Sequence, residues 1–373
     1  MRIFIDARVI QDHFPGIGRY AFNLIDALAP ISADELLVLV AEDARNTRYD
    51  LTRLARHPNV ELIPTTIPIF HPRSQTALPG IIRGLRPDLA HFFYNVRPLR
   101  VAVPSLLTLY DVIPRRFPGY YPPATRLKIE IIQRLAIRRS RHFLAISQAT
   151  AADFIRFYRV PQTRITVTPL APDPIFHPRP PELLPPFRQR FNLPEAYLLY
   201  LGSNKPHKNL PRLMRAWREA LDAGLDEHAC LVIAGHWDDR YPQARELAAS
   251  LGMASRVRFL GPVSGEDLPL LYAAARAFIF PSRYEGFGLP ALEAMASGVP
   301  VGASRAPGLM EVVGDAALTF DPLSIQEMTQ VILQLMMDDS QRAALRAAGL
   351  ARASHFTWQR TARLTLEAYH RLT

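Results

Sequence analysis

Two glutamates separated by seven residues are the first candidates for chemistry in this sequence. Glu285 and Glu293 flank the string Gly-Phe-Gly-Leu-Pro-Ala-Leu, which follows the apolar run Ala277–Phe280. That run has the length and composition of a buried strand. Gly286 and Gly288 allow the backbone to turn sharply and to approach a ligand closely. We therefore expect two carboxylates beside a glycine-bearing loop, where they can accept hydrogen bonds from the hydroxyl groups of a sugar.

A helix should follow this loop, because Pro290 suits the first helical turn and Gly298 suits a C-cap. We expect it from about Leu289 to Ser297. Its free backbone N–H groups, near Phe287 and Leu289, and its positive dipole end would suit a phosphate. The alternative is that both glutamates are ordinary acids, one in a solvated loop and one favoured by the helix dipole.

A turn containing two lysines is the second candidate site. Lys205, His207 and Lys208 lie in the string Gly-Ser-Asn-Lys-Pro-His-Lys-Asn, directly after the predicted strand Tyr197–Leu201. The only other lysine in the chain is Lys128. Lysine is a compact, mobile charge that suits a phosphate group. Because lysine is otherwise so rare, a phosphate-binding role is favoured over solvated turn lysines.

Two further candidates lie in the first half of the chain. Gly16, Ile17 and Gly18 follow the strand predicted from Arg2 and open a helix, an arrangement that can hold a phosphate. An ordinary tight turn is the alternative, since the third glycine of the dinucleotide motif is missing. Tyr110 and Asp111 end another predicted strand, and Tyr110 could either bond a ligand through its hydroxyl or pack in the core.

Composition limits the kind of protein. A length of 373 residues suggests two domains, and no uninterrupted apolar run is long enough for a transmembrane helix. The N-terminus has the pattern of a strand and not of a signal peptide. The single cysteine, Cys230, allows neither an internal disulfide nor a cysteine-based zinc site. These features favour the cytoplasm, and we expect no metal ion and no cofactor.

Strands alternate with helices along the chain, which predicts an α/β protein with parallel sheets. A stretch rich in proline interrupts this rhythm and cannot sustain a strand or a long helix. We therefore predict a first domain over residues 1–176, a proline-rich linker over 177–194, a second domain over 195–355 and a terminal helix over 356–373.

The positive charge is concentrated in the first half. Residues 1–178 carry a net charge of +9 and residues 179–373 carry +1. An anionic partner such as a membrane surface or a phospholipid-linked molecule would suit this half. The predicted helix at 123–141 places Arg126, Arg134, Arg138 and Arg141 where they could contact anionic headgroups. A solvated basic face is the alternative. Nucleic acid is not expected, because aromatic residues do not alternate with the basic ones.

The string from Glu285 to Val301 resembles the signature of the family 4 glycosyltransferases, which is two glutamates separated by seven residues. The string Gly-Ile-Gly-Arg-Tyr at residue 16 is similar to the first loop of that family, and the Lys208-Asn209 turn resembles its lysine-asparagine turn. Tyr110 stands where the family often has a histidine. The resemblance extends over nearly the whole chain.

This resemblance implies the GT-B architecture, in which two Rossmann-like domains face each other across a cleft and the terminal helix returns to the first domain. It implies retaining, metal-independent hexosyl transfer from a nucleotide sugar bound by the second domain to a glycan or lipid-linked acceptor bound by the first. Lys208, with Lys205 or His207 assisting, would hold the diphosphate. Glu285 would orient the sugar and Glu293 would accept the ribose hydroxyls.

Similarity to mannosyltransferases of surface-polysaccharide assembly favours GDP-mannose as the donor, with UDP-glucose as the alternative. Two other classes of function remain open. One is a different enzyme on the same fold, such as a sugar-nucleotide epimerase or a phosphorylase. The other is an inactive subunit that binds a nucleotide sugar, for which the tyrosine at position 110 is the only indication.

Overall fold

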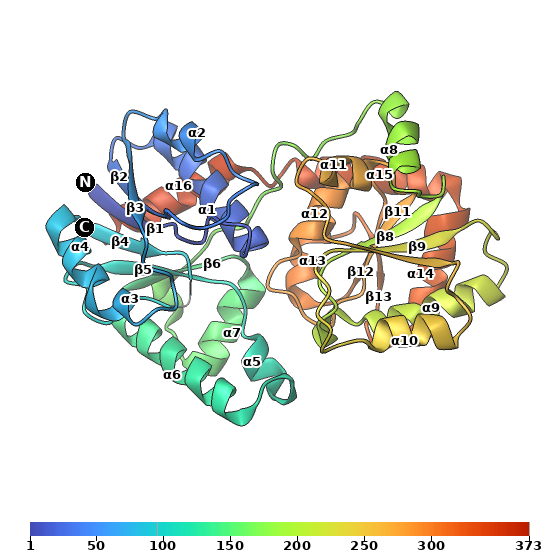
Figure 1. Cartoon of the computed structure of the whole chain (residues 1–373), viewed down its shortest axis with the longest axis horizontal. Coiled ribbons are helices and arrows are strands. Elements are labelled where there is room, and N and C mark those ends of the chain that lie inside the picture. The colour runs from blue at the N-terminus through green and yellow to red at the C-terminus, as the bar shows by residue number, and fades with distance from the viewer. Residues whose placement is uncertain (95, 373) are drawn as a thin grey trace. The chain divides into compact units, whose positions relative to one another are not determined.

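The computed structural model describes residues 1–94 and 96–372 and contains two compact units, each built around a parallel sheet (Figure 1). The first unit comprises Met1–Leu170 and Thr357–Thr373, and the second comprises Ala171–Phe356. The predicted α/β class with two Rossmann-like domains is confirmed.

The sheet of the first unit has seven strands in the order β3-β2-β1-β4-β5-β6-β7, and all neighbouring strands are parallel. The strands are β1 (Arg2–Asp6), β2 (Glu35–Ala41), β3 (Val60–Thr65), β4 (Leu89–Phe92), β5 (Ser105–Leu109), β6 (His142–Ala145) and β7 (Ile165–Val167). The central strands β4, β5 and β6 are buried along their whole length. Helices cover both faces of such a sheet, which explains the continuous apolar runs in the sequence.

The helices of the first unit are α1 (Pro15–Leu28), α2 (Leu51–Ala55), α3 (Arg73–Thr76), α4 (Leu78–Leu85), α5 (Ile113–Arg116), α6 (Pro123–Arg139), α7 (Gln148–Tyr158) and α16 (Trp358–His370). Short 3-10 turns occur at η1 (Ala29–Ile31), η2 (Pro118–Tyr120) and η3 (Gln162–Arg164). None of the helices in the described ranges is both long enough and apolar enough to cross a membrane.

The second unit has a six-stranded parallel sheet in the order β10-β9-β8-β11-β12-β13. The strands are β8 (Tyr197–Leu201), β9 (Cys230–Ala234), β10 (Val257–Gly261), β11 (Ala277–Phe280), β12 (Val301–Ser304) and β13 (Leu318–Phe320). Its helices are α8 (Leu184–Arg190), α9 (Leu210–Asp222), α10 (Gln243–Ser250), α11 (Leu268–Ala273), α12 (Leu289–Ala296), α13 (Pro307–Val313), α14 (Ile325–Met337) and α15 (Asp339–Ala353), with 3-10 turns η4 (Pro181–Leu183) and η5 (Pro206–Lys208).

The proline-rich stretch belongs to the second unit. It contains the helix α8, which lies against α11 and buries the side chain of Phe187. Two prolines stand in the first turn of α8. Proline lacks a backbone N–H, but N–H groups in the first turn of a helix have no intrahelical acceptor, so no hydrogen bond is lost.

The terminal helix α16 belongs to the first unit, where it lies beside α1 (Figure 1). A buried polar chain fixes it to the sheet. His91 Nδ1 lies 2.7 Å from the hydroxyl of Tyr369, and His91 Nε2 lies 2.8 Å from Oγ1 of Thr108. Burial lowers the pKa of His91 to about 3, so the ring is neutral and both of its nitrogens are satisfied by hydroxyls.

Replacing Tyr369 by Phe should therefore lower the free energy of unfolding by about 1–3 kcal/mol, because one buried nitrogen of His91 loses its partner. Urea unfolding followed by circular dichroism measures the change. Tyr241→Phe is the matched control, because the half-buried Tyr241 has no hydroxyl hydrogen bond to the described residues. An equal loss of stability in both variants would show that α16 does not depend on this bond.

Candidate active site

The candidate site lies at the carboxyl edge of the sheet in the second unit. After β8 the chain proceeds to β9 and β10 on one side and then returns to place β11 on the other side of β8. This reversal leaves a crevice beyond the carboxyl ends of β8 and β11, the place where open α/β sheets bind ligands. The Lys208 turn follows β8 and the Glu285 loop follows β11.

The two turns meet in an ion pair. Lys208 Nζ donates a hydrogen bond to Glu285 Oε1 at 2.7 Å, although the residues are 77 positions apart. The side chains are only 17% and 13% exposed, so this pair is shielded from water far more than an ordinary surface pair. The ammonium also lies 5.2 Å from the ring centre of Phe280, the last residue of β11. Both charged residues could be predicted from the sequence, but their contact could not.

Two buried polar residues shape the surroundings of this pair. The hydroxyl of Tyr200 donates to the backbone oxygen of Ser203 at 2.7 Å, and burial followed by the charge of Glu285 raises its pKa well above the ordinary value. Burial, with smaller effects of the charges of Lys208 and Lys205, lowers the pKa of His207 to about 3. His207 is therefore neutral at pH 7. The side chain of Lys205 is exposed.

Asn209 is a site residue whose role the sequence did not reveal. Its backbone is left-handed, with φ of 64°, and its side chain is 2% exposed. The amide Nδ2 donates to the backbone oxygens of Pro281 and Pro322, at 3.0 and 2.7 Å. These oxygens belong to the segments that follow β11 and β13. Asn209 therefore holds the lysine turn against two other strand ends and helps to fix the position of Lys208.

The glycine loop has the geometry that its sequence predicts. Gly288 has φ of +119° and forms the N-cap of α12, where a residue with a side chain would be strained. The backbone oxygen of Glu285 lies close to α13, since a Cβ at Gly308 would come within 2.4 Å of it. Phe287 is buried and packs edge-on against Phe356. The loop is thus held rigidly, and Gly286 and Leu289 are partly exposed beside the start of α12.

Glu293 lies one turn into α12 and is more deeply buried than expected. It is 2% exposed, and the hydroxyl of Tyr272 donates to its Oε2 at 2.9 Å. Tyr272, which comes from α11, is therefore a second residue that the sequence did not connect with the site. Its bond orients the carboxylate whose proposed task is to accept ribose hydroxyls.

Gly16 and Gly18, predicted to lie in a loop that opens a helix, lie within the helix itself. Helix α1 begins at Pro15, so Gly16, Ile17 and Gly18 form its first turn. The amide of Gly18 donates to the oxygen of Phe14, and a Cβ at Gly18 would lie 2.8 Å from the oxygen of Val9. Close packing therefore requires glycine at position 18. Gly16 has open space around its α-carbon.

Tyr110 and Asp111 follow β5 at the carboxyl edge of the first sheet. The hydroxyl of Tyr110 is buried, and its ring lies edge-on to Tyr20 at 6.0 Å. Burial, with smaller effects of Tyr20 and Tyr94, raises its pKa well above the ordinary value. The half-buried Tyr110 is thus packed beside another tyrosine, and its hydroxyl makes no hydrogen bond to the described residues. The carboxylate of Asp111 accepts a hydrogen bond from the amide of Ile113 at 3.0 Å and so shapes the turn into α5.

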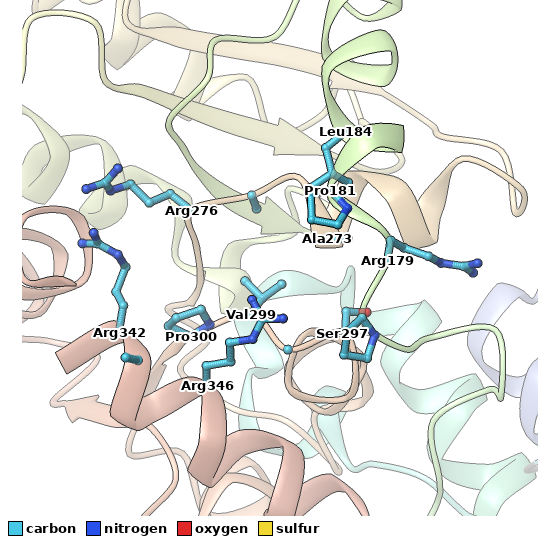
Figure 2. Close-up of a pocket in the computed structure, with 14 residues that line it drawn as sticks. Arg179, Pro181, Leu184, Ala273, Arg276, Ser297, Val299, Pro300, Arg342 and Arg346 are labelled. Atoms are coloured by element: carbon cyan, nitrogen blue, oxygen red, sulfur yellow. The ribbon is translucent and has the colours of Figure 1, made fainter. Parts of the chain in front are cut away.

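A cavity of about 370 Å³ lies at the opposite edge of the second sheet, and Figure 2 shows the residues that line it. Arg276, Val299 and Pro300, which line it, precede β11 and β12 and therefore lie at the amino ends of these strands. None of the predicted site residues lines it. Arg276 and Arg342 are both paired there with Asp339. This cavity is separate from the Lys208–Glu285 site.

Two family models match this chain. Residues 15–174 match glycosyltransferase family 4, and residues 186–352 match the glycosyl transferases group 1. The O-antigen chain mannosyltransferase B of Escherichia coli is 34% identical to it over 99% of both chains. This chain is a family 4 glycosyltransferase. The transferase also resembles a second E. coli protein, the serotype-specific mannosyltransferase WbdA. The identity is 30%, and the match covers 80% of the transferase and 38% of WbdA.

Solved structures agree with the fold. The sucrose-phosphate synthase of Thermosynechococcus elongatus has a TM-score of 0.75 at 20% identity and covers 100% of this transferase and 98% of that chain. The Anabaena protein HepE, in complex with UDP and glucose, has a TM-score of 0.75 at 23% identity over 100% and 99% of the two chains. At these identities the likeness establishes the GT-B fold, as the sequence predicts.

Loss of the lysine charge should affect catalysis strongly. We expect Lys208→Ala to reduce kcat/KM about 10²-fold or more, because a leaving diphosphate would lose its counter-charge. Lys208→Arg should recover only part of the activity, since a planar fork does not replace a point charge. Steady-state kinetics measures both. Arg215→Ala is the control, because Arg215 is an exposed cation of α9 in the same unit. Full activity in Lys208→Ala would exclude the phosphate role.

Proposed function

We propose that this protein transfers mannose from GDP-mannose to a glycan or lipid-linked acceptor, with retention of configuration, during the assembly of a surface polysaccharide. The observation that carries the proposal is the shielded Lys208–Glu285 pair at the strand switch of the second unit. The names of its full-length E. coli relative and of WbdA support mannose as the sugar. We further propose that the second unit binds the donor and the first unit the acceptor.

The proposed reaction exchanges one bond at the anomeric carbon. The bond between that carbon and the diphosphate oxygen breaks, and the acceptor hydroxyl oxygen forms the new bond from the same face. The proton of the acceptor hydroxyl passes to the departing diphosphate. Negative charge develops on the diphosphate in the transition state, where Lys208 and the amides at the start of α12 can stabilise it. We propose that this charge stabilisation requires no metal ion.

The ion pair gives donor binding a specific consequence. The ammonium group of Lys208 lies 2.7 Å from Oε1 of Glu285 in the structure. A diphosphate that approaches Lys208 therefore competes with Glu285 for this ammonium group. Glu285 would then be free to accept hydrogen bonds from the hydroxyls of the sugar. Glu293, oriented by Tyr272, would accept the ribose hydroxyls. We propose that Lys205 assists Lys208 in binding the phosphates, and that His207 lies beside Lys208 as a neutral ring.

A donor comparison tests the proposal. With a mannose-terminated synthetic glycolipid as acceptor, kcat/KM for GDP-mannose should exceed that for UDP-glucose at least about tenfold, as expected when a site is built to bond one base and sugar. The product should retain the anomeric configuration of the donor by NMR, and EDTA should not change the rate. A preference for UDP-glucose would assign the protein to the glucosyltransferases. An inverted product would contradict the proposed mechanism.

We also propose that helix α6 brings the enzyme to the cytoplasmic surface of an anionic membrane. Leu127 and Ile131 lie one helical turn apart and are 60% and 49% exposed, beside the exposed cations Arg126 and Lys128. Apolar residues flanked by cations are typical of interfacial helices. Arg134 is less available, since it is paired with Glu130 at 2.5 Å.

Replacing Leu127 and Ile131 by Gln should reduce co-sedimentation with phosphatidylglycerol vesicles at least about threefold, because the apolar anchor is lost. Binding should also weaken above about 0.15 M salt. The control is the double variant Leu183→Gln, Leu323→Gln, which removes two exposed leucines of the second unit. Equal binding of both double variants would rule out α6 as the membrane contact.

A further inference from the structure

A second concentration of charge lies at the amino edge of the first sheet, on the side opposite to Asp111. A cavity of about 810 Å³ opens there between the C-terminus of α6 and the starts of β5, β6 and β7. Five arginines line it: Arg138, Arg139, Arg141, Arg164 and Arg371. Within the described ranges, no carboxylate belongs to its lining.

A sixth arginine, Arg97, is buried beneath the lining of this cavity, which we call the arginine cavity. Arg97 is 3% exposed, and its guanidinium donates to the backbone oxygens of Pro98 and Arg139, at 2.9 and 2.5 Å, and to the hydroxyls of Ser105 and Ser140. All these acceptors are neutral. Across residues 1–94 and 96–372, no carboxylate bonds to Arg97. A buried charge of this kind is costly unless an opposite charge lies near it.

The end of helix α6 compensates only a small part of this charge. Arg97 bonds the oxygen of Arg139, and Arg164 bonds the oxygens of Ser140 and Arg141, so both side chains cap this helix end. A helix C-terminus is equivalent to about half a negative charge. Glu367 lies 3.8 Å from Arg371 in an exposed pair, which contributes little. Among the residues that the structure describes, the six arginines therefore face only this partial charge and the exposed carboxylate of Glu367.

The titratable groups of the cavity show the resulting field. Burial lowers the pKa of His142, and the charges of Arg371 and Arg164 lower it further. Burial lowers the pKa of Arg97 to about 10, with an added effect of Arg139. The pKa of Arg164 is lowered by burial and by Arg141. The charges that act on these three groups are all positive, in agreement with a described lining that contains arginines and no carboxylate.

We propose that the arginine cavity binds a phosphate-bearing anion, either a soluble phosphoryl compound or the phosphate of a lipid headgroup. Guanidinium forks bond phosphate oxygens in pairs, and a multiply charged anion neutralises this cluster better than a single carboxylate does. Arg138, Arg139 and Arg141 are exposed and make no side-chain hydrogen bond to the described residues, so they are available to such a ligand. The proposal is independent of the donor site, which lies in the other unit.

Calorimetric titration with pyrophosphate tests the soluble source. All chains carry Lys208→Ala, so that the donor-site lysine does not contribute. The triple variant Arg138→Gln, Arg139→Gln, Arg141→Gln is compared with a control that loses the same net charge elsewhere in the first unit: Arg56→Gln, Arg83→Gln, Arg363→Gln. The cavity variant should bind pyrophosphate at least about tenfold more weakly than the parent, and the control should stay within about twofold.

Co-sedimentation with phosphatidylglycerol vesicles, and with phosphatidylcholine vesicles as a reference, tests the lipid source with the same three chains. If the cavity variant loses binding only to pyrophosphate, the cavity is assigned to a soluble phosphoryl compound. A loss confined to anionic vesicles assigns it to a headgroup. If the cavity variant and the control behave alike in both assays, or if the parent binds neither probe, the cavity is not an anion site and the proposal is overturned.

Discussion

The candidate active site depends on one interaction, the shielded contact between Lys208 and Glu285. Opposite charges with little exposure to water attract strongly, but each would be costly without its partner. The surrounding structure holds both groups in place. Asn209 fixes the lysine turn to two other strand ends, and the packing of Gly308 against Glu285 fixes the glutamate loop. A ligand that supplies negative charge to Lys208 can replace Glu285 without leaving the lysine unpaired. In the proposed reaction the diphosphate of the donor takes this place, and Glu285 is released to bond the sugar.

Much of the fold could be predicted from the sequence, because parallel strands buried on both faces appear as apolar runs and glycine and proline mark the turns. The strand Ala277–Phe280 and the helix starting at Leu289 are examples, and the structure has both. Contacts between distant residues were not predictable. Nothing local in the sequence connects Lys208 with Glu285 or Tyr272 with Glu293, since these pairs depend on how strands are ordered in the sheet. The hydrogen bonds of the Asn209 side chain to Pro281 and Pro322 have the same origin.

In the first unit, too, the contacts of the charged residues could not be predicted from the local sequence. Composition revealed an excess of positive charge, and helical spacing suggested a face with four arginines. Folding separates that set, because Arg134 pairs with Glu130 while Arg138 and Arg141 join residues from three other segments around a cavity. Arg97 and Arg371 were not recognised because they lie far from the helix in sequence. The two sheets thus use charge differently: the second holds a balanced pair at its carboxyl edge, and the first holds an unbalanced cluster at its amino edge.

We propose that Lys208 holds a diphosphate. Calorimetric binding of GDP and GMP to the wild-type protein and to Lys208→Ala tests it most directly, because the two nucleotides differ only in the phosphate that the lysine would contact. The wild type should bind GDP at least about tenfold more tightly than GMP, as expected for a charge-assisted bond, and Lys208→Ala should lose most of this difference. The same preference for GDP in both proteins would contradict the account.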